Sequence, residues 1–180
     1  MTTVPFQEVV LGPGDWWVGD AQYRVRTLLG SCVAVVLWHP TRRIGGMCHV
    51  VLPARVVRST GGLSGRYADE ALELLADALG DRGTQPREYR TGLYGGSRML
   101  AGLARASASD PKCTDVACRN LDTVRKLLGT WGFRLAEEDS GGTRYRTLRF
   151  DVWSGELQVQ HGARPLPTAS VVPSNRQQGA

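Results

Sequence analysis

Residues 27–53 read TLLGSCVAVVLWHPTRRIGGMCHVVLP, and this stretch decides the fold. Its first half contains a continuous apolar run over residues 33–38, rich in β-branched side chains, which is typical of a central strand covered on both faces. The turn-like HPTRR follows. Residues 44–52 then predict a returning strand that ends at Pro53, because proline has no N–H to donate to a sheet. The stretch therefore predicts a buried β-hairpin.

The length of the connecting loop predicts which residues of the hairpin face each other. A four-residue loop over 39–42 is a common hairpin length and places Trp38 opposite Arg43. Continued along both strands, the same pairing places Cys32 directly opposite His49, on one face of the hairpin. A loop of two or six residues would leave the two side chains diagonal to each other.

A cysteine beside a histidine is typical of nucleophilic catalysis. The thiolate is the reactive form, and a neighbouring imidazole can accept the thiol proton. Gly30 and Ser31 precede Cys32, and backbone N–H groups there can hold an oxyanion. The residues alone leave open a second interpretation, in which Cys32 is a small core residue and His49 is structural. Cys48 points to the other face of its strand and is predicted to belong to the core.

The remainder of the chain shows both helical and strand patterns. Apolar residues at helical spacing predict helices over 67–79 and 115–131. Alternating segments bounded by turn residues predict strands over 16–29, 89–94, 133–137, 144–152 and 156–160. We expect one α/β domain over residues 1–163, with a mixed, mostly antiparallel sheet and about two main helices. Residues 164–180 are proline-rich and polar, which predicts a disordered tail.

Length and composition exclude several classes of protein. The chain has 180 residues, of which 42% are hydrophobic, enough for one well-packed domain. It lacks both a continuous apolar stretch of about 18 residues and a secretory signal pattern, so we expect a cytoplasmic protein without membrane insertion. Four cysteines are too few and too scattered for a disulfide scaffold, and free thiols are expected. Zinc-site spacing is missing, so we predict neither a metal site nor a cofactor.

The positive charge leaves the partner open. The formal net charge is +5, but the basic residues are dispersed along the chain. The tightest group comprises Arg144, Arg146 and Arg149, in an alternating segment where they can form a solvated strand face. A signature of nucleic-acid binding does not accompany them, and an acidic protein surface suits the charge equally well. The charge alone therefore does not identify the partner, and a nucleic acid is the least supported candidate.

Several motifs, in order, resemble one family. The stretch TLLGSC...GGMCHVVLP resembles the signature of the CheD family, the chemoreceptor glutamine deamidases of bacterial chemotaxis. The resemblance extends over roughly residues 7–160 through PGDWWVGD, GRYADEALELLADAL, TGLYGGSRML, CRNLDTVRKLL and EEDSGGTRYRTLRFDVWSGELQV. It implies a single-domain α/β sandwich similar to cysteine-dependent toxin deamidases. It also implies an enzyme that converts specific receptor glutamines to glutamate and thereby tunes signalling and receptor methylation.

The resemblance also implies a role for each of three residues. Cys32 matches the nucleophile, His49 matches the general base, and Thr27 matches a threonine that orients the histidine. Chemoreceptors are then the protein substrate, and a CheC-type phosphatase is a further expected partner. An alternative is an adaptor that binds receptors or that phosphatase with little catalysis. A papain-like hydrolase is less well supported, because the motifs provide no Asn or Asp to orient His49.

Overall fold

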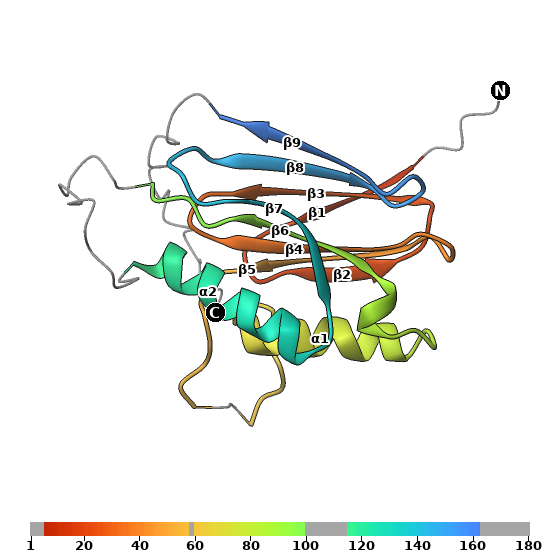
Figure 1. Ribbon diagram of the computed structural model, residues 1–180, viewed down its shortest axis with the longest axis horizontal. Coiled ribbons are helices and arrows are strands. Elements are labelled where there is room, and N and C mark those ends of the chain that lie inside the picture. Colours follow the sequence, from red (N-terminus) through yellow and green to blue (C-terminus); the bar gives the residue numbers. More distant parts are fainter. Residues whose placement is uncertain (1–5, 58–59, 100–114, 163–180) are drawn as a thin grey trace, which may run out of the picture.

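Two β-sheets and two helices form three layers (Figure 1). The structure is a computed structural model that describes residues 6–57, 60–99 and 115–162. The helices are α1 (Ala68–Gly80) and α2 (Val116–Thr130), with a short 3-10 helix, η1 (Pro86–Glu88). The strands are β1 (Gln7–Leu11), β2 (Trp16–Gly19), β3 (Tyr23–Leu29), β4 (Val33–His39), β5 (Ile44–Val50), β6 (Arg90–Gly95), β7 (Arg134–Ser140), β8 (Arg146–Asp151) and β9 (Glu156–His161).

The predicted fold class is confirmed. One sheet has the order β1-β3-β8-β9 and the other has the order β2-β5-β4-β6-β7. Only β1–β3 and β6–β7 pair in parallel among these described strands, so both sheets are mixed and mostly antiparallel. The strand β1 had no counterpart among the predicted elements. The proposed tail at 164–180 lies outside the described residues.

The five-stranded sheet lies in the middle of the molecule and is covered on both faces. Helices α1 and α2 pack on one face through Leu72, Leu75, Val124 and Leu128, all almost fully buried. The four-stranded sheet covers the other face through a second cluster that includes Met47 and Phe150. Burial on both faces explains the continuous apolar run of β4, because a half-exposed strand would alternate.

The hairpin forms, but its predicted register is wrong. Ala34, not Cys32, pairs with His49, and the last pair before the turn is His39 with Ile44. His39 thus remains in the strand, buried against Tyr89 in an edge-to-face ring contact 5.2 Å between centroids. The loop is therefore residues 40–43. Sequence spacing carries no information about the contact between His39 and Tyr89.

Two further expectations are corrected by the structure. Arg146 is buried, with 5% of its surface exposed, so the group of three arginines is not a uniformly solvated face. Cys32 and Cys48 carry free thiols, whereas Cys118 is disulfide-bonded, so the expectation of free thiols fails there. Cys48 is fully buried on the helix side of its sheet, as predicted. No helix in the described ranges is both long enough and apolar enough to cross a membrane.

Candidate active site

Three strand ends bring the predicted site residues together at one end of the molecule. Strands β3 and β5 both end there and β4 begins there, at the left of Figure 1. Thr27 faces inward from β3 in the four-stranded sheet, because the alternate residues Val25 and Leu29 are also buried. His49 belongs to β5 of the other sheet. The candidate site therefore lies between the two sheets.

Thr27 and His49 are joined across the gap between the sheets. The Thr27 hydroxyl Oγ1 lies 2.8 Å from the imidazole Nδ1 of His49 and 2.8 Å from the carbonyl oxygen of Leu11. Both side chains are 3% exposed. A carbonyl can only accept, so the single hydroxyl proton goes to Leu11 and Oγ1 accepts from Nδ1–H. This assigns the tautomer in which Nε2 carries the free lone pair.

Cys32 lies on the same face as the histidine. It comes two residues before Ala34, the cross-strand partner of His49, so strand alternation directs both side chains toward the four-stranded sheet. Cys32 packs at the margin of the inter-sheet cluster that contains Ala34 and Met47. The thiol is only half-buried, whereas the imidazole is almost fully enclosed. The cysteine is thus diagonal to the histidine and is the more accessible of the two.

Burial sets the resting charge of this pair. It raises the pKa of the Cys32 thiol, an effect that the positive charge of Arg66 opposes. It lowers the pKa of His49 below its ordinary value, while the Leu11 carbonyl and the Asp15 carboxylate raise that pKa in part. The site therefore holds a neutral thiol and a neutral imidazole near pH 7. A neutral imidazole with a free Nε2 can act as a base.

Two backbone donors next to the thiol have no acceptor among the described residues. The N–H groups of Ser31 and Cys32 donate no hydrogen bond within the described part of the chain. The carbonyls of Gly30 and Cys32, by contrast, are both used: they accept from Ser97 N–H at 2.9 Å and from Gly96 N–H at 2.8 Å. Free N–H groups beside a nucleophile can receive an oxyanion.

Neighbouring loops hold the histidine and bring a cation close. The His49 N–H donates to Asp15 O at 2.9 Å, and Gly14 N–H donates to His49 O at 2.8 Å. The carbonyl of Arg66 accepts from the N–H groups of the two residues that follow β5, both at 2.9 Å. This anchors Arg66 beside the Gly14 turn, and its exposed guanidinium makes no ion pair with any described residue. The motif PGDWW contains Gly14 and Asp15, and the motif GRYAD contains Arg66. The sequence of these motifs does not predict that the two loops are in contact.

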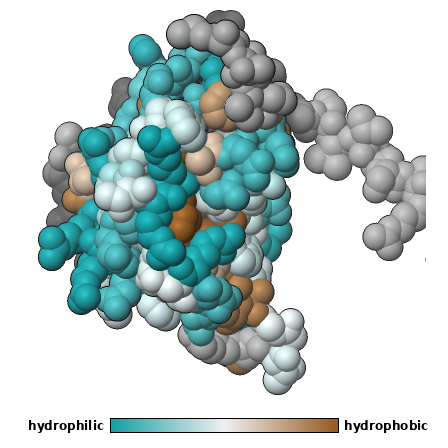
Figure 2. All heavy atoms as spheres, turned by 90° about the vertical axis from the view of Figure 1, so that its right-hand side faces the viewer, coloured by the Kyte–Doolittle hydropathy of each residue, from teal (hydrophilic) through white to brown (hydrophobic). Residues whose placement is uncertain are grey.

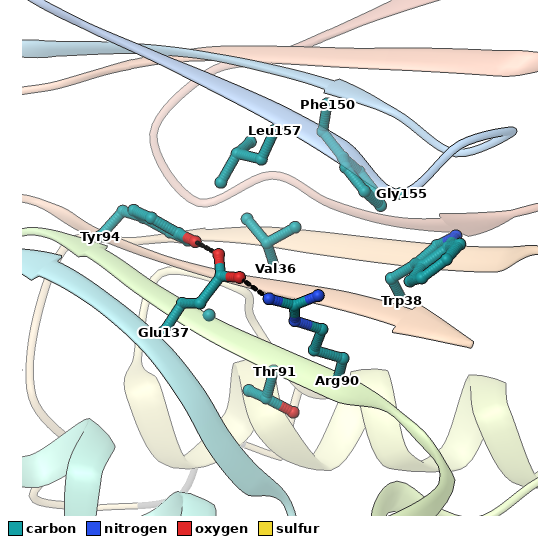
Figure 3. A pocket seen from close by; sticks show the side chains of 10 residues that line it. Val36, Trp38, Arg90, Thr91, Tyr94, Glu137, Phe150, Gly155 and Leu157 are labelled. Carbon is teal, nitrogen blue, oxygen red and sulfur yellow. Dashed lines mark hydrogen bonds and ion pairs between the residues drawn. The ribbon is translucent and has the colours of Figure 1, made fainter. Parts of the chain in front are cut away.

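A different hollow lies along the margin between the sheets and does not contain the cysteine (Figure 3). There Glu137 accepts from the Tyr94 hydroxyl at 3.1 Å and pairs with Arg90. Burial and the Glu137 charge raise the pKa of Tyr94. The phenol is thus held as a neutral donor, and the lining has no nucleophile paired with a base. This hollow therefore offers no alternative pair of a nucleophile and a base.

The described residues contain no group of three or more His, Cys, Asp or Glu side chains that could hold a metal ion. At the opposite end of the molecule, where the β4–β5 and β8–β9 turns lie, the surface is mostly hydrophilic (Figure 2). Apolar residues show there only in small patches.

Comparison with known proteins identifies the family. The family described as "CheD chemotactic sensory transduction" matches residues 51–161. The chain belongs to the CheD family. A protein of Pseudomonas savastanoi pv. phaseolicola, named "Probable chemoreceptor glutamine deamidase CheD", is 44% identical over 89% of this chain and 88% of its own length. Its namesake in Pseudomonas fluorescens is 45% identical over 86% of this chain and 84% of its own length.

A more distant comparison gives the same family. "Probable chemoreceptor glutamine deamidase CheD 1" of Leptospira interrogans is 32% identical over 85% of this chain and 92% of its own length. The predicted family is therefore confirmed over most of the chain.

Proposed function

We propose that this protein hydrolyses the side-chain amide of specific glutamines on the cytoplasmic part of bacterial chemoreceptors, yielding glutamate. The names of its relatives support the substrate class. The 2.8 Å contact between Thr27 Oγ1 and His49 Nδ1 carries the proposal, because it leaves Nε2 free on the face that Cys32 shares. In this proposal Cys32 is the nucleophile, His49 is the base and Thr27 orients the base.

The first half of the reaction forms a thioester. His49 Nε2 takes the thiol proton while Cys32 Sγ bonds to the amide carbon, and the carbonyl electron pair moves to oxygen. The N–H groups of Ser31 and Cys32 receive that oxyanion. The oxyanion then collapses, the C–N bond breaks, and the imidazolium gives its proton to the departing ammonia.

The second half releases glutamate. His49, neutral again, takes a proton from water as the water oxygen bonds to the thioester carbon. The C–S bond breaks, the sulfur regains a proton from the imidazolium, and the carboxylic acid so formed gives its remaining proton to solvent to become the carboxylate. The product adds a negative charge to the receptor and provides a carboxylate that can be methylated. The net positive charge of this protein suits a substrate with an acidic surface.

The test is ammonia release from a purified chemoreceptor. We expect wild type to release ammonia and to produce the mass increase of glutamine converted to glutamate in receptor peptides. Cys32→Ala abolishes both signals while circular dichroism shows an unchanged fold. Undiminished ammonia release by Cys32→Ala would overturn the nucleophile assignment.

The same preparation tests the adaptor alternative. Receptor binding without ammonia release by wild type would replace deamidation with a binding role. A CheC-type phosphatase is the second proposed partner, and co-purification of the two proteins tests it. Retention of that binding in the Cys32→Ala variant would separate the binding role from catalysis.

A further inference from the structure

Arg146 is a buried cation at the end of the molecule that carries Cys32. It lies on the inward face of β8, cross-strand from Leu29, and is 5% exposed. Its guanidinium donates to Asp139 Oδ1 from Nε at 3.0 Å and from Nη2 at 2.8 Å. The remaining Nη1 donates to Gly141 O at 2.9 Å and to Ser97 Oγ at 2.7 Å. All three nitrogens are therefore satisfied, as a buried guanidinium requires.

The Arg146 cluster joins the two sheets. Asp139 belongs to β7 of the five-stranded sheet, whereas Arg146 belongs to the four-stranded sheet. His161, the cross-strand partner of Arg146, approaches the other oxygen of Asp139 at 3.0 Å. One carboxylate thus meets two basic side chains from the opposite sheet. Arg146, His161 and Asp139 thus form a clasp across the gap between the sheets, which the Thr27–His49 contact also crosses.

Ser97 connects this clasp to the cysteine. It is fully buried, and besides accepting from Arg146 its hydroxyl donates to the carbonyl of Arg144 at 2.5 Å. Its N–H donates to Gly30 O at 2.9 Å, and the preceding Gly96 N–H donates to Cys32 O at 2.8 Å. The segment 96–97 therefore holds the carbonyls on both sides of Ser31.

Holding the Gly30 carbonyl orients the N–H of Ser31. A peptide unit is planar and trans, so the direction of the Gly30 carbonyl sets the opposite direction of the Ser31 N–H. The approach of the two segments is close: a Cβ at Gly95, where φ is +101°, would lie 2.3 Å from Cys32 O. The backbone beside the nucleophile is thus pressed against a segment that Arg146 supports.

We propose that Arg146 is a positioning residue, which holds Cys32 and the adjacent N–H of Ser31 through the hydroxyl and N–H of Ser97. The inference rests on the proposed deamidation and adds a support for its geometry. Arg146 touches no reacting atom. Its effect passes through two hydrogen bonds, from Arg146 to the Ser97 hydroxyl and from the Ser97 N–H to the Gly30 carbonyl. Loss of the planar guanidinium therefore displaces the nucleophile without removing a reacting group.

The chain contains a matched control for this ion pair. Arg24 pairs with Asp151 in the same four-stranded sheet, and its Nη2 donates to Oδ2 at 3.0 Å. This pair joins neighbouring strands within one sheet and has no hydrogen bond to the segments 30–32 or 96–97. Arg24→Met therefore removes an arginine–carboxylate pair from the same sheet without affecting the clasp.

The experiment compares Arg146→Lys, Ser97→Ala and Arg24→Met in the full chain. Lysine at position 146 keeps the positive charge but lacks the planar guanidinium with its several N–H donors, and alanine at position 97 removes a single hydroxyl. We expect the first two variants to lower kcat for ammonia release about tenfold or more with KM little changed, since displacement of a catalytic group by about 1 Å can cost a hundredfold. Hydrogen exchange at the Gly96 and Ser97 amides accelerates in both. Arg24→Met keeps kcat within about twofold of wild type.

The readouts separate this inference from deamidation itself. Wild type that releases no ammonia would refute the proposed function, while amide exchange and the rate of Cys32 alkylation by iodoacetamide, followed by peptide mass spectrometry, would still test the positioning. Folded Ser97→Ala and Arg146→Lys proteins with the kcat, alkylation rate and amide exchange of Arg24→Met would overturn the positioning role. A kcat decrease that only follows the unfolded fraction would overturn it as well.

Discussion

Thr27→Val is the sharpest perturbation of the proposed site. Valine has nearly the shape of threonine but no hydroxyl, so the substitution removes the Oγ1 that lies 2.8 Å from both His49 Nδ1 and Leu11 O. Both side chains of the pair are 3% exposed, so water cannot easily replace the lost partner. The imidazole keeps its place in β5 but loses the acceptor that selects its tautomer.

The size of the effect follows from the charge that His49 gains. A hydrogen bond between neutral groups contributes about 0.5–1.5 kcal/mol, and one to a charged group about 1.5–3 kcal/mol. The imidazole becomes an imidazolium when it takes the thiol proton, so the transition state loses roughly 1–2 kcal/mol more than the resting enzyme. Because 1.36 kcal/mol is a factor of ten in rate, kcat falls about 5- to 30-fold. Unpaired buried polar groups also lower the free energy of unfolding by about 1–3 kcal/mol.

The assay is ammonia release from a purified receptor over a range of pH, with thermal unfolding measured on the same samples. Thr27→Val also shifts the acidic limb of the kcat/KM profile to lower pH, because loss of the acceptor disfavours the imidazolium. Thr27→Ser is the control and keeps kcat near that of wild type, since its hydroxyl can occupy the same position. A folded Thr27→Val enzyme with the kcat and pH profile of wild type would refute the reasoning.

Four further outcomes follow from the same structure. Arg66→Gln raises the pKa of Cys32, so the alkylation rate of that thiol at pH 7 falls; an unchanged pH profile of alkylation would contradict this. Burial lowers the pKa of His49, so the unfolded chain binds its proton first and stability is lost as the pH falls below about 6.5. Urea unfolding at neutral and acidic pH measures this loss, which is smaller in His49→Gln. Burial raises the pKa of Cys48 to about 12, so peptide mass spectrometry of the native protein finds it unmodified when Cys32 is alkylated. Leu75→Ala, in the fully buried layer beneath α1, lowers the free energy of unfolding by about 2–5 kcal/mol in urea titration, with residual activity in the folded fraction.

Much of the fold was predictable because it depends on local pattern. The apolar run at residues 33–38 predicted a strand buried on both faces, and the two amphipathic segments predicted α1 and α2 within one or two residues of their ends. Cys48 was correctly assigned to the core from strand alternation alone. These features follow from the two-residue period of strands and the 3.6-residue period of helices.

The register of the hairpin was not predictable from loop length. Four residues do connect the strands, but His39 stays in the strand, where its ring packs on Tyr89, fifty residues later in the chain. The resulting shift moves the partner of His49 from Cys32 to Ala34 and keeps the same face. The prediction that Cys32 and His49 lie on the same face is therefore confirmed, while the prediction that they are direct cross-strand partners is wrong.

The sequence by itself determined most of the strand and helix pattern, though not β1, together with the family and the residue types able to carry an amide hydrolysis. Only the tertiary structure decided that Thr27 and His49 meet across two different sheets and that Arg146 is buried beside Asp139. The physical reason is the same for both. Periodicity indicates which face of an element is apolar, whereas contacts between sheets depend on how separate elements stack. The sequence pattern therefore predicts that a charged residue is exposed to solvent, and only the position of its partner in the other sheet shows that it is buried.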